Sequence, residues 1–146
     1  MTAGFIVGFD SDKEDIFERQ IAFIQNAGIP VAMVGLLLAL PNTMLYRRLK
    51  KENRILSNST GNNTHDFDIN FVPVMKRDIL IDGYKKIISK IYSPKYYFRR
   101  CLLLLKRFPQ KKAGGNSLEI NNIRALFLSI IKQGFSTYGF YYIKYL

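Results

Sequence analysis

The stretch Gly4–Asp10, read as Gly-Phe-Ile-Val-Gly-Phe-Asp, constrains the fold of this chain more than any other feature. A glycine-punctuated apolar run leads directly into an acidic segment, which predicts a strand, a bend and a helix N-terminus in succession. We expect residues 4–9 to form a strand buried on both faces, as in parallel sheets. Ser11 and Glu14 match a capping box, and Gly28 stands where a left-handed residue ends a helix.

A second unit of the same kind follows. Residues 31–40 are an uninterrupted apolar run that predicts another buried strand, and residues 41–43 form a tight exit into a short helix. Strand, helix, strand and helix with short connections are the repeat of a parallel α/β sheet or barrel. Two strands cannot close a barrel. With no residues ahead to supply neighbouring strands, we expect an α/β fold that is a partial (β/α) barrel, the back part of a larger enzyme.

The second half of the chain has a different character. A polar loop over residues 57–70 and a short extended segment over 70–75 precede three basic helical stretches, which begin near Asp78, Pro94 and Ser117. Residues 1–73 hold 7 Lys and Arg against 8 Asp and Glu, a balance of −1, whereas residues 74–146 hold 15 against 3, a balance of +12. This asymmetry indicates two regions with different surroundings. We therefore predict a barrel part over residues 1–75 and a mostly α-helical basic C-terminal domain over 76–146.

Few residues are suited to chemistry. Cys101 is the only cysteine, so the chain's own residues cannot form an internal disulfide, a paired-cysteine zinc site or an iron–sulfur cluster, and we expect a half-buried thiol on a helix. His65, Asp66 and Asp68 lie in the polar loop, which favours a solvated surface over a metal site. The sequence shows no secretory signal and no apolar run of about 20 residues, which leads us to expect a cytoplasmic protein.

Four segments in order resemble the C-terminal part of cobalamin-binding radical SAM proteins. Residues 4–10 are similar to the fifth barrel strand of that superfamily, whose pattern is GxIxGxxE, although Ser11 stands in place of the glutamate. Residues 38–46 resemble the exit from the sixth strand, often ALPGTPLY, with Asn42 in place of the glycine and Met44 in place of the second proline. Residues 70–75 and 91–100 resemble the helical C-terminal domain of a subgroup that includes hopanoid methylases.

The resemblance implies both a chemistry and what this chain lacks for it. Intact family members use an iron–sulfur cluster, S-adenosylmethionine (SAM) and cobalamin, with a CxxxCxxC loop that is missing from this sequence. We therefore interpret the chain as a truncated or split portion of a methyltransferase-like enzyme, inactive alone, with no cofactor of its own. A separate chain would then carry the cobalamin and cluster-binding portions. By the same resemblance, the residues that contact SAM would be Gly4, Ile6, Gly8, Leu40 and Pro41.

Two alternatives stay open at the level of sequence. Gly4 and Gly8 either approach a ligand or simply let a helix pack closely against the strand. The basic stretch from Lys85 to Lys112 is either a solvated helical face or an adaptor surface for an anionic membrane or an acidic partner, and a nucleic acid is disfavoured because no recognised binding signature is present.

Overall fold

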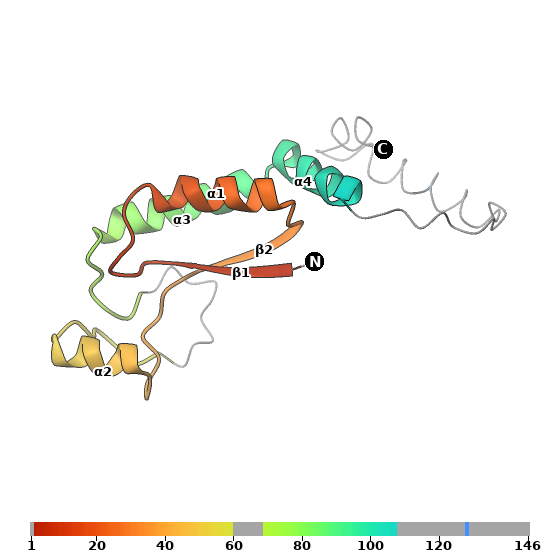
Figure 1. Cartoon of the computed structure of the whole chain (residues 1–146). Coiled ribbons are helices and arrows are strands. Elements are labelled where there is room, and N and C mark those ends of the chain that lie inside the picture. Colours follow the sequence, from red (N-terminus) through yellow and green to blue (C-terminus); the bar gives the residue numbers. More distant parts are fainter. Residues whose placement is uncertain (1, 60–68, 108–127, 129–146) are drawn as a thin grey trace.

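A computed structural model describes residues 2–59, 69–107 and 128 of the chain (Figure 1). Within these residues the fold is mixed α/β, with a two-stranded parallel sheet and four helices. In chain order the elements are β1 (Thr2–Val7), α1 (Ile16–Ala27), β2 (Val31–Leu36), α2 (Met44–Lys51), α3 (Arg77–Ile91) and α4 (Pro94–Arg107). The expected polar loop over 60–68, with His65, Asp66 and Asp68, and the expected helix from Ser117 lie outside the described residues.

The sheet forms because the connection through α1 returns the chain parallel to β1. The two strands pair in register from Thr2 opposite Val31 to Val7 opposite Leu36. Helices α1 and α3 lie together over one face of the sheet (Figure 1). The core between these layers consists of apolar residues that are at most 9% exposed, among them Val7, Ile24, Ala32, Val34, Leu80 and Ile87. The sheet therefore has one well-covered face.

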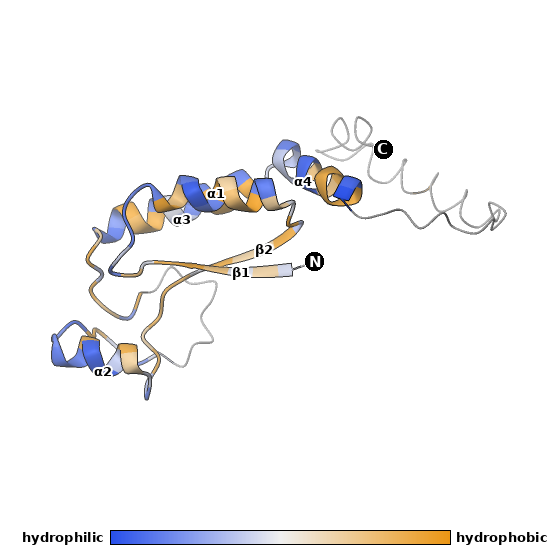
Figure 2. Ribbon diagram, in the orientation of Figure 1, coloured by the Kyte–Doolittle hydropathy of each residue, from blue (hydrophilic) through white to orange (hydrophobic). Residues whose placement is uncertain are grey.

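The opposite face of the sheet is apolar but uncovered within the described residues. Figure 2 shows both strands coloured as apolar along most of their length. Alternation along a strand places Ile6, Val31 and Met33 together with Gly4 on this face, and the three apolar side chains are 49%, 43% and 64% exposed. The expectation of strands buried on both faces is thus wrong for the described part of the chain, and a partial barrel is not confirmed by it.

Local signals predicted the element ends with mixed success. Gly28 ends α1 in the left-handed conformation (φ 68°), and Pro94 is the first residue of α4, both as expected. The capping box at Ser11 and Glu14 does not form, because α1 begins only at Ile16. The strands also differ from the expected 4–9 and 31–40: β1 spans residues 2–7 and β2 spans 31–36.

The fourth helix is fastened to the rest by one buried cation. Arg100 of α4 is 0% exposed, and its guanidinium donates to the backbone carbonyls of Ile29 and Pro30, just before β2, and of Ile91 at the end of α3. Burial lowers the pKa of Arg100, since no carboxylate among the described residues compensates for its lost hydration. Cys101, beside it, is the half-buried thiol expected from the sequence.

Helix α3 also packs on α1 and β2, so core contacts cross the predicted domain boundary near residue 75. That boundary stays a prediction. None of the helices within the described ranges is both long and apolar enough to cross a lipid bilayer.

Candidate functional site

The carboxyl ends of β1 and β2 lie at the same edge of the sheet, and in parallel α/β folds that edge is where ligands bind. All five residues predicted to contact a cofactor lie on the strands or on the segments that leave this edge. The geometry of this edge is determined by two turns, one buried amide side chain and one network of ion pairs.

The turn after β1 is closed by hydrogen bonds to the side chain of Asp12. Gly8 is buried with a φ of 109°, a left-handed conformation that side chains rarely adopt, and a Cβ there would lie 3.2 Å from Leu80 Cδ2. The Oδ2 atom of Asp12 accepts hydrogen bonds from the amides of Gly8 (2.9 Å) and Phe9 (3.0 Å). Close packing against Leu80 accounts for the glycine at position 8. Because Asp12 accepts hydrogen bonds from these two amides, they are not available to bind a ligand.

The exit from β2 is a second turn. The amide of Thr43 donates to the carbonyl of Leu40 (3.3 Å), which places Pro41 and Asn42 at its corners. Asn42 has a φ of 68°, and proline followed by a residue with positive φ is the sequence requirement of a type II turn. Asparagine tolerates this conformation better than other side chains, which explains how it can stand where the family pattern has glycine. Thr43 then caps α2, its Oγ1 accepting from the amide of Tyr46 (3.1 Å).

A buried amide holds the segment between β2 and this turn. Asn70 is 3% exposed, its Oδ1 accepts from the amide of Ala39 (2.9 Å), and its Nδ2 donates to the carbonyls of Ala39 (2.8 Å) and Ser57 (3.2 Å). The side chain satisfies both backbone groups of Ala39, as a neighbouring strand would. Leu40 and Pro41, the next two residues, are thereby fixed at the sheet edge.

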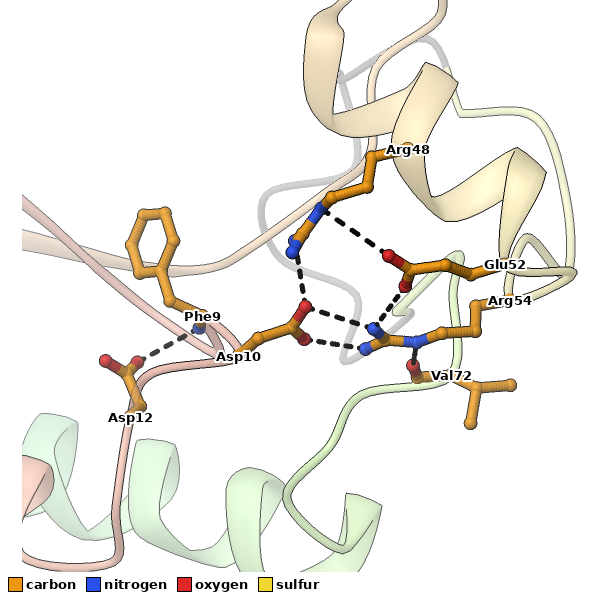
Figure 3. Close-up of polar contacts among 7 residues, drawn as sticks. All are labelled: Phe9, Asp10, Asp12, Arg48, Glu52, Arg54 and Val72. Atoms are coloured by element: carbon orange, nitrogen blue, oxygen red, sulfur yellow. Dashed lines mark hydrogen bonds and ion pairs between the residues drawn. The ribbon is translucent and has the colours of Figure 1, made fainter.

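A network of four charged side chains joins the exit of β1 to α2 and the residues after it (Figure 3). Asp10 forms a bidentate pair with Arg54, at 2.6 and 3.0 Å, and a second ion pair with Arg48 at 2.8 Å. Arg54 also bonds Glu52 (2.9 Å), and its Nε donates to the carbonyl of Val72 (2.8 Å). The hydrogen bond from Arg54 holds the pKa of Asp10 below its usual range, and Asp10 in turn raises the pKa of Arg54.

The structure places the five predicted contact residues in three surroundings. Gly4 and Ile6 lie on the uncovered face of the sheet, and no atom comes within 4 Å of the point where a Cβ on Gly4 would stand. Gly8 is buried in the first turn, while Leu40 and Pro41 are exposed in the second. Pro41 also lines a depression of about 470 Å³ together with residues of α2 and the segment after it: Asn42, Tyr46, Arg47, Lys50, Asn58 and Ser59. Their contact with a cofactor stays a prediction.

This arrangement is suited to binding rather than to proton transfer. The exposed Ile6, Leu40 and Pro41 offer apolar surface against which a flat ring can pack. Asp10 is a poor general base, because two arginines stabilise its ionised form. Within the described ranges no three side chains of the types His, Cys, Asp and Glu gather as metal ligands would. An iron–sulfur cluster does not fit the residues of this chain, since Cys101 is its single cysteine and lies on α4.

Sequence reasoning missed the residues that build the edge. It identified the strands and turns but not the partners of Asp10, nor the role of Asn70, which lies 31 residues from Ala39. A usable signal exists for Asp10 alone, as a carboxylate three residues after the end of a strand and two residues after a glycine. Nothing local distinguishes Asn70 from the other asparagines around it.

Comparison with known proteins identifies relatives of this chain. A family model described as a domain of unknown function, DUF4070, matches residues 43–146. The uncharacterized methyltransferase sll1242 of Synechocystis sp. is 35% identical over 135 residues, which is 90% of this chain and 25% of that protein. The hopanoid C-2 methylase of Rhodopseudomonas palustris is 28% identical over 100 residues, which is 68% of this chain and 18% of that protein.

The chain thus spans about a quarter, or less, of the length of these curated relatives. No solved structure matches it.

Proposed function

The chain belongs to the DUF4070 family, and from that premise we propose that it serves as the C-terminal portion of a cobalamin-dependent radical SAM methyltransferase. In this role β1 and β2 are the last strands of a barrel, and the helices after them form the C-terminal domain. The methyltransferase names of both relatives support the reaction class.

The observation that carries the proposal is the uncovered apolar face of the sheet. The side chains of Ile6, Val31 and Met33 are each more than 40% exposed and lie on the same face of the parallel sheet. A parallel sheet is normally covered on both faces, and β1 has a sheet neighbour, β2, on one side only within the described strands. Further barrel strands would cover this face and pair with β1.

In this proposal the chain's own residues bind and position, while a separate polypeptide segment or partner chain carries the cobalamin domain and the cluster-binding cysteines. The cluster, supplied from there, would provide the electron for reductive cleavage of SAM. Ile6, Leu40 and Pro41 would pack against the adenosine part of SAM at the sheet edge. The Asp10 network would hold the β1 exit against α2, so that these surfaces keep a fixed spacing.

Reconstitution tests the proposal. The chain is mixed with the part of the Synechocystis relative that the alignment leaves uncovered, about three quarters of that protein, after this part is reconstituted with iron, sulfide and cobalamin. We expect the two to co-purify and to form 5′-deoxyadenosine from SAM and a reductant, with neither part active alone. Ile6→Asp and Met33→Asp place a charge on the uncovered face and should abolish the complex, whereas Val74→Asp, at a 68% exposed residue outside the sheet, should not.

Three outcomes are informative. Association that Ile6→Asp disrupts and Val74→Asp preserves, together with SAM cleavage, supports the whole proposal. Association without SAM cleavage removes the proposed chemistry but keeps the barrel. A lack of association, or association that the sheet-face variants do not affect, contradicts the partial barrel.

A further inference from the structure

Helix α4 follows α3 and lies beside the end of α1 (Figure 1). A cleft separate from the sheet edge is lined by residues of these three helices. Its volume is about 440 Å³, within the range of small-molecule sites and too large for a single bound ion. Part of its lining is apolar, formed by Ile21 of α1 with Leu102 and Leu103 of α4. The cleft can therefore hold an apolar group as well as a polar one.

The charges of the cleft are unbalanced. Its lining contains three cationic side chains, Lys90, Arg99 and Lys106, and one carboxylate, Glu18. The Oε1 atom of Glu18 lies 2.7 Å from the Nζ atom of Lys86, a residue outside the lining. This ion pair lowers the pKa of Glu18. No carboxylate among residues 2–59 and 69–107 forms an ion pair with Arg99 or Lys106. Glu18 also interacts electrostatically with Lys90, so the positive charge that has no carboxylate partner in the described part of the chain is that of Arg99 and Lys106.

The spacing of the cations suits an extended anion. Arg99 and Lys106 are two turns apart on α4, or about 10 Å along the helix axis. Lys90 contributes from α3, with its Nζ 5.3 Å from the centre of the Tyr96 ring. An arginine beside two lysines is a combination that binds phosphate oxygens well, because the guanidinium adds bidentate hydrogen bonds to the point charges of the lysines.

We propose that this cleft binds a phosphate ester or diphosphate, with the anionic group at Arg99 and Lys106 and its apolar portion on Leu102 and Leu103. The shared chemistry is a phosphate on an apolar group, whether that group is soluble or part of a lipid. The proposal stands independently of methyl transfer, since none of the cleft residues belongs to the sheet edge.

Binding of defined probes to the full chain tests this site. Inorganic pyrophosphate and dodecyl phosphate are titrated at low salt by calorimetry, and phosphatidylcholine vesicles with and without phosphatidic acid are tested by co-sedimentation. The test variant is Arg99→Gln with Lys106→Gln, at exposed positions where folding should be preserved. The matched control is Lys13→Gln with Lys51→Gln, which removes the same charge from two exposed lysines outside the cleft.

We expect wild type and the control to bind dodecyl phosphate more tightly than pyrophosphate, and the cleft variant to lose at least about tenfold in affinity, as expected for lost charge-assisted hydrogen bonds. A soluble source is indicated if vesicles with phosphatidic acid do not bind, and a lipid source if they bind through the same two residues. The absence of phosphate binding at low salt would overturn the proposal. So would an equal loss of affinity in the control, since that would reduce the effect to net charge.

Discussion

Arg100 offers the sharpest test of how the helical part is attached to the sheet. Its side chain is fully buried, and it donates to Ile29 (2.8 Å), Pro30 (3.2 Å) and the last turn of α3 at Ile91. The rings of Tyr92 and Tyr97 lie 6.0 and 5.7 Å from its guanidinium carbon. The charge is therefore balanced by carbonyl oxygens and aromatic rings, and we predict that Arg100→Met loosens α4 from both β2 and α3.

The expected magnitude follows from the groups left behind. Each buried carbonyl without a donor costs about 1–3 kcal/mol, and three are exposed to this loss. Removing a buried cation with no carboxylate partner returns several kcal/mol of desolvation, and the Pro30 carbonyl is only partly buried, so water can reach it. We expect a net loss of about 2–4 kcal/mol in the free energy of unfolding. Arg100→Lys should fall between wild type and Arg100→Met, because one ammonium cannot reach three carbonyls.

Urea denaturation followed by circular dichroism measures this loss, since the chain has no tryptophan for fluorescence. With a slope of about 1–3 kcal/mol per molar urea, the midpoint should fall by about 1 M or more. Arg99→Met is the matched control, because the neighbouring side chain is exposed, and it should change stability by at most about 0.5 kcal/mol. If the free energy of unfolding of Arg100→Met lies within about 1 kcal/mol of that of the control, the hydrogen bonds from Arg100 to the three carbonyls contribute far less than expected.

Two further predictions concern packing and charge. Gly83→Ala places a Cβ 2.3 Å from the Phe17 ring between α3 and α1. It should lower the free energy of unfolding by about 1–3 kcal/mol, although alanine has the better helix propensity. Gly35→Ala, with no atom within 4 Å of its Cβ, is the control and should lower the free energy of unfolding much less in the same urea assay. The ion pairs that lower the pKa of Asp10 stabilise the fold above the ordinary value of 3.8 and are lost as pH falls below it. Acid titration followed by circular dichroism should therefore show less pH dependence for Asp10→Asn than for wild type, and equal curves would contradict the network.

The elements were predictable from the sequence where their signals are local. Alternating strand and helix patterns, the glycine that ends α1 and the proline that begins α4 each depend on a residue's own backbone preferences, and the structure contains all of them. The turn after β1 was not predictable in detail, because a capping box would bond the amides of Ser11 and Glu14, whereas Asp12 accepts from the earlier amides of Gly8 and Phe9.

Partners distant in sequence were beyond local reasoning. Asn70 and Arg100 act on backbone carbonyls 31 and 70 residues away, and many polar side chains could have met those carbonyls. The exposure of one sheet face was missed for a related reason. An apolar strand pattern reports that a face is suited to burial, but not which element, or which polypeptide, lies over it.

Hydrogen exchange of the β1 amides tests the central claim most directly. Amides of residues 2–7 that do not point toward β2 have no strand neighbour within the described residues. We predict that they exchange rapidly in the chain alone and become strongly protected when the part of the methyltransferase relative that the alignment leaves uncovered is added. Full protection of β1 in the isolated chain, unchanged by that addition, would contradict the claim that these strands complete a barrel.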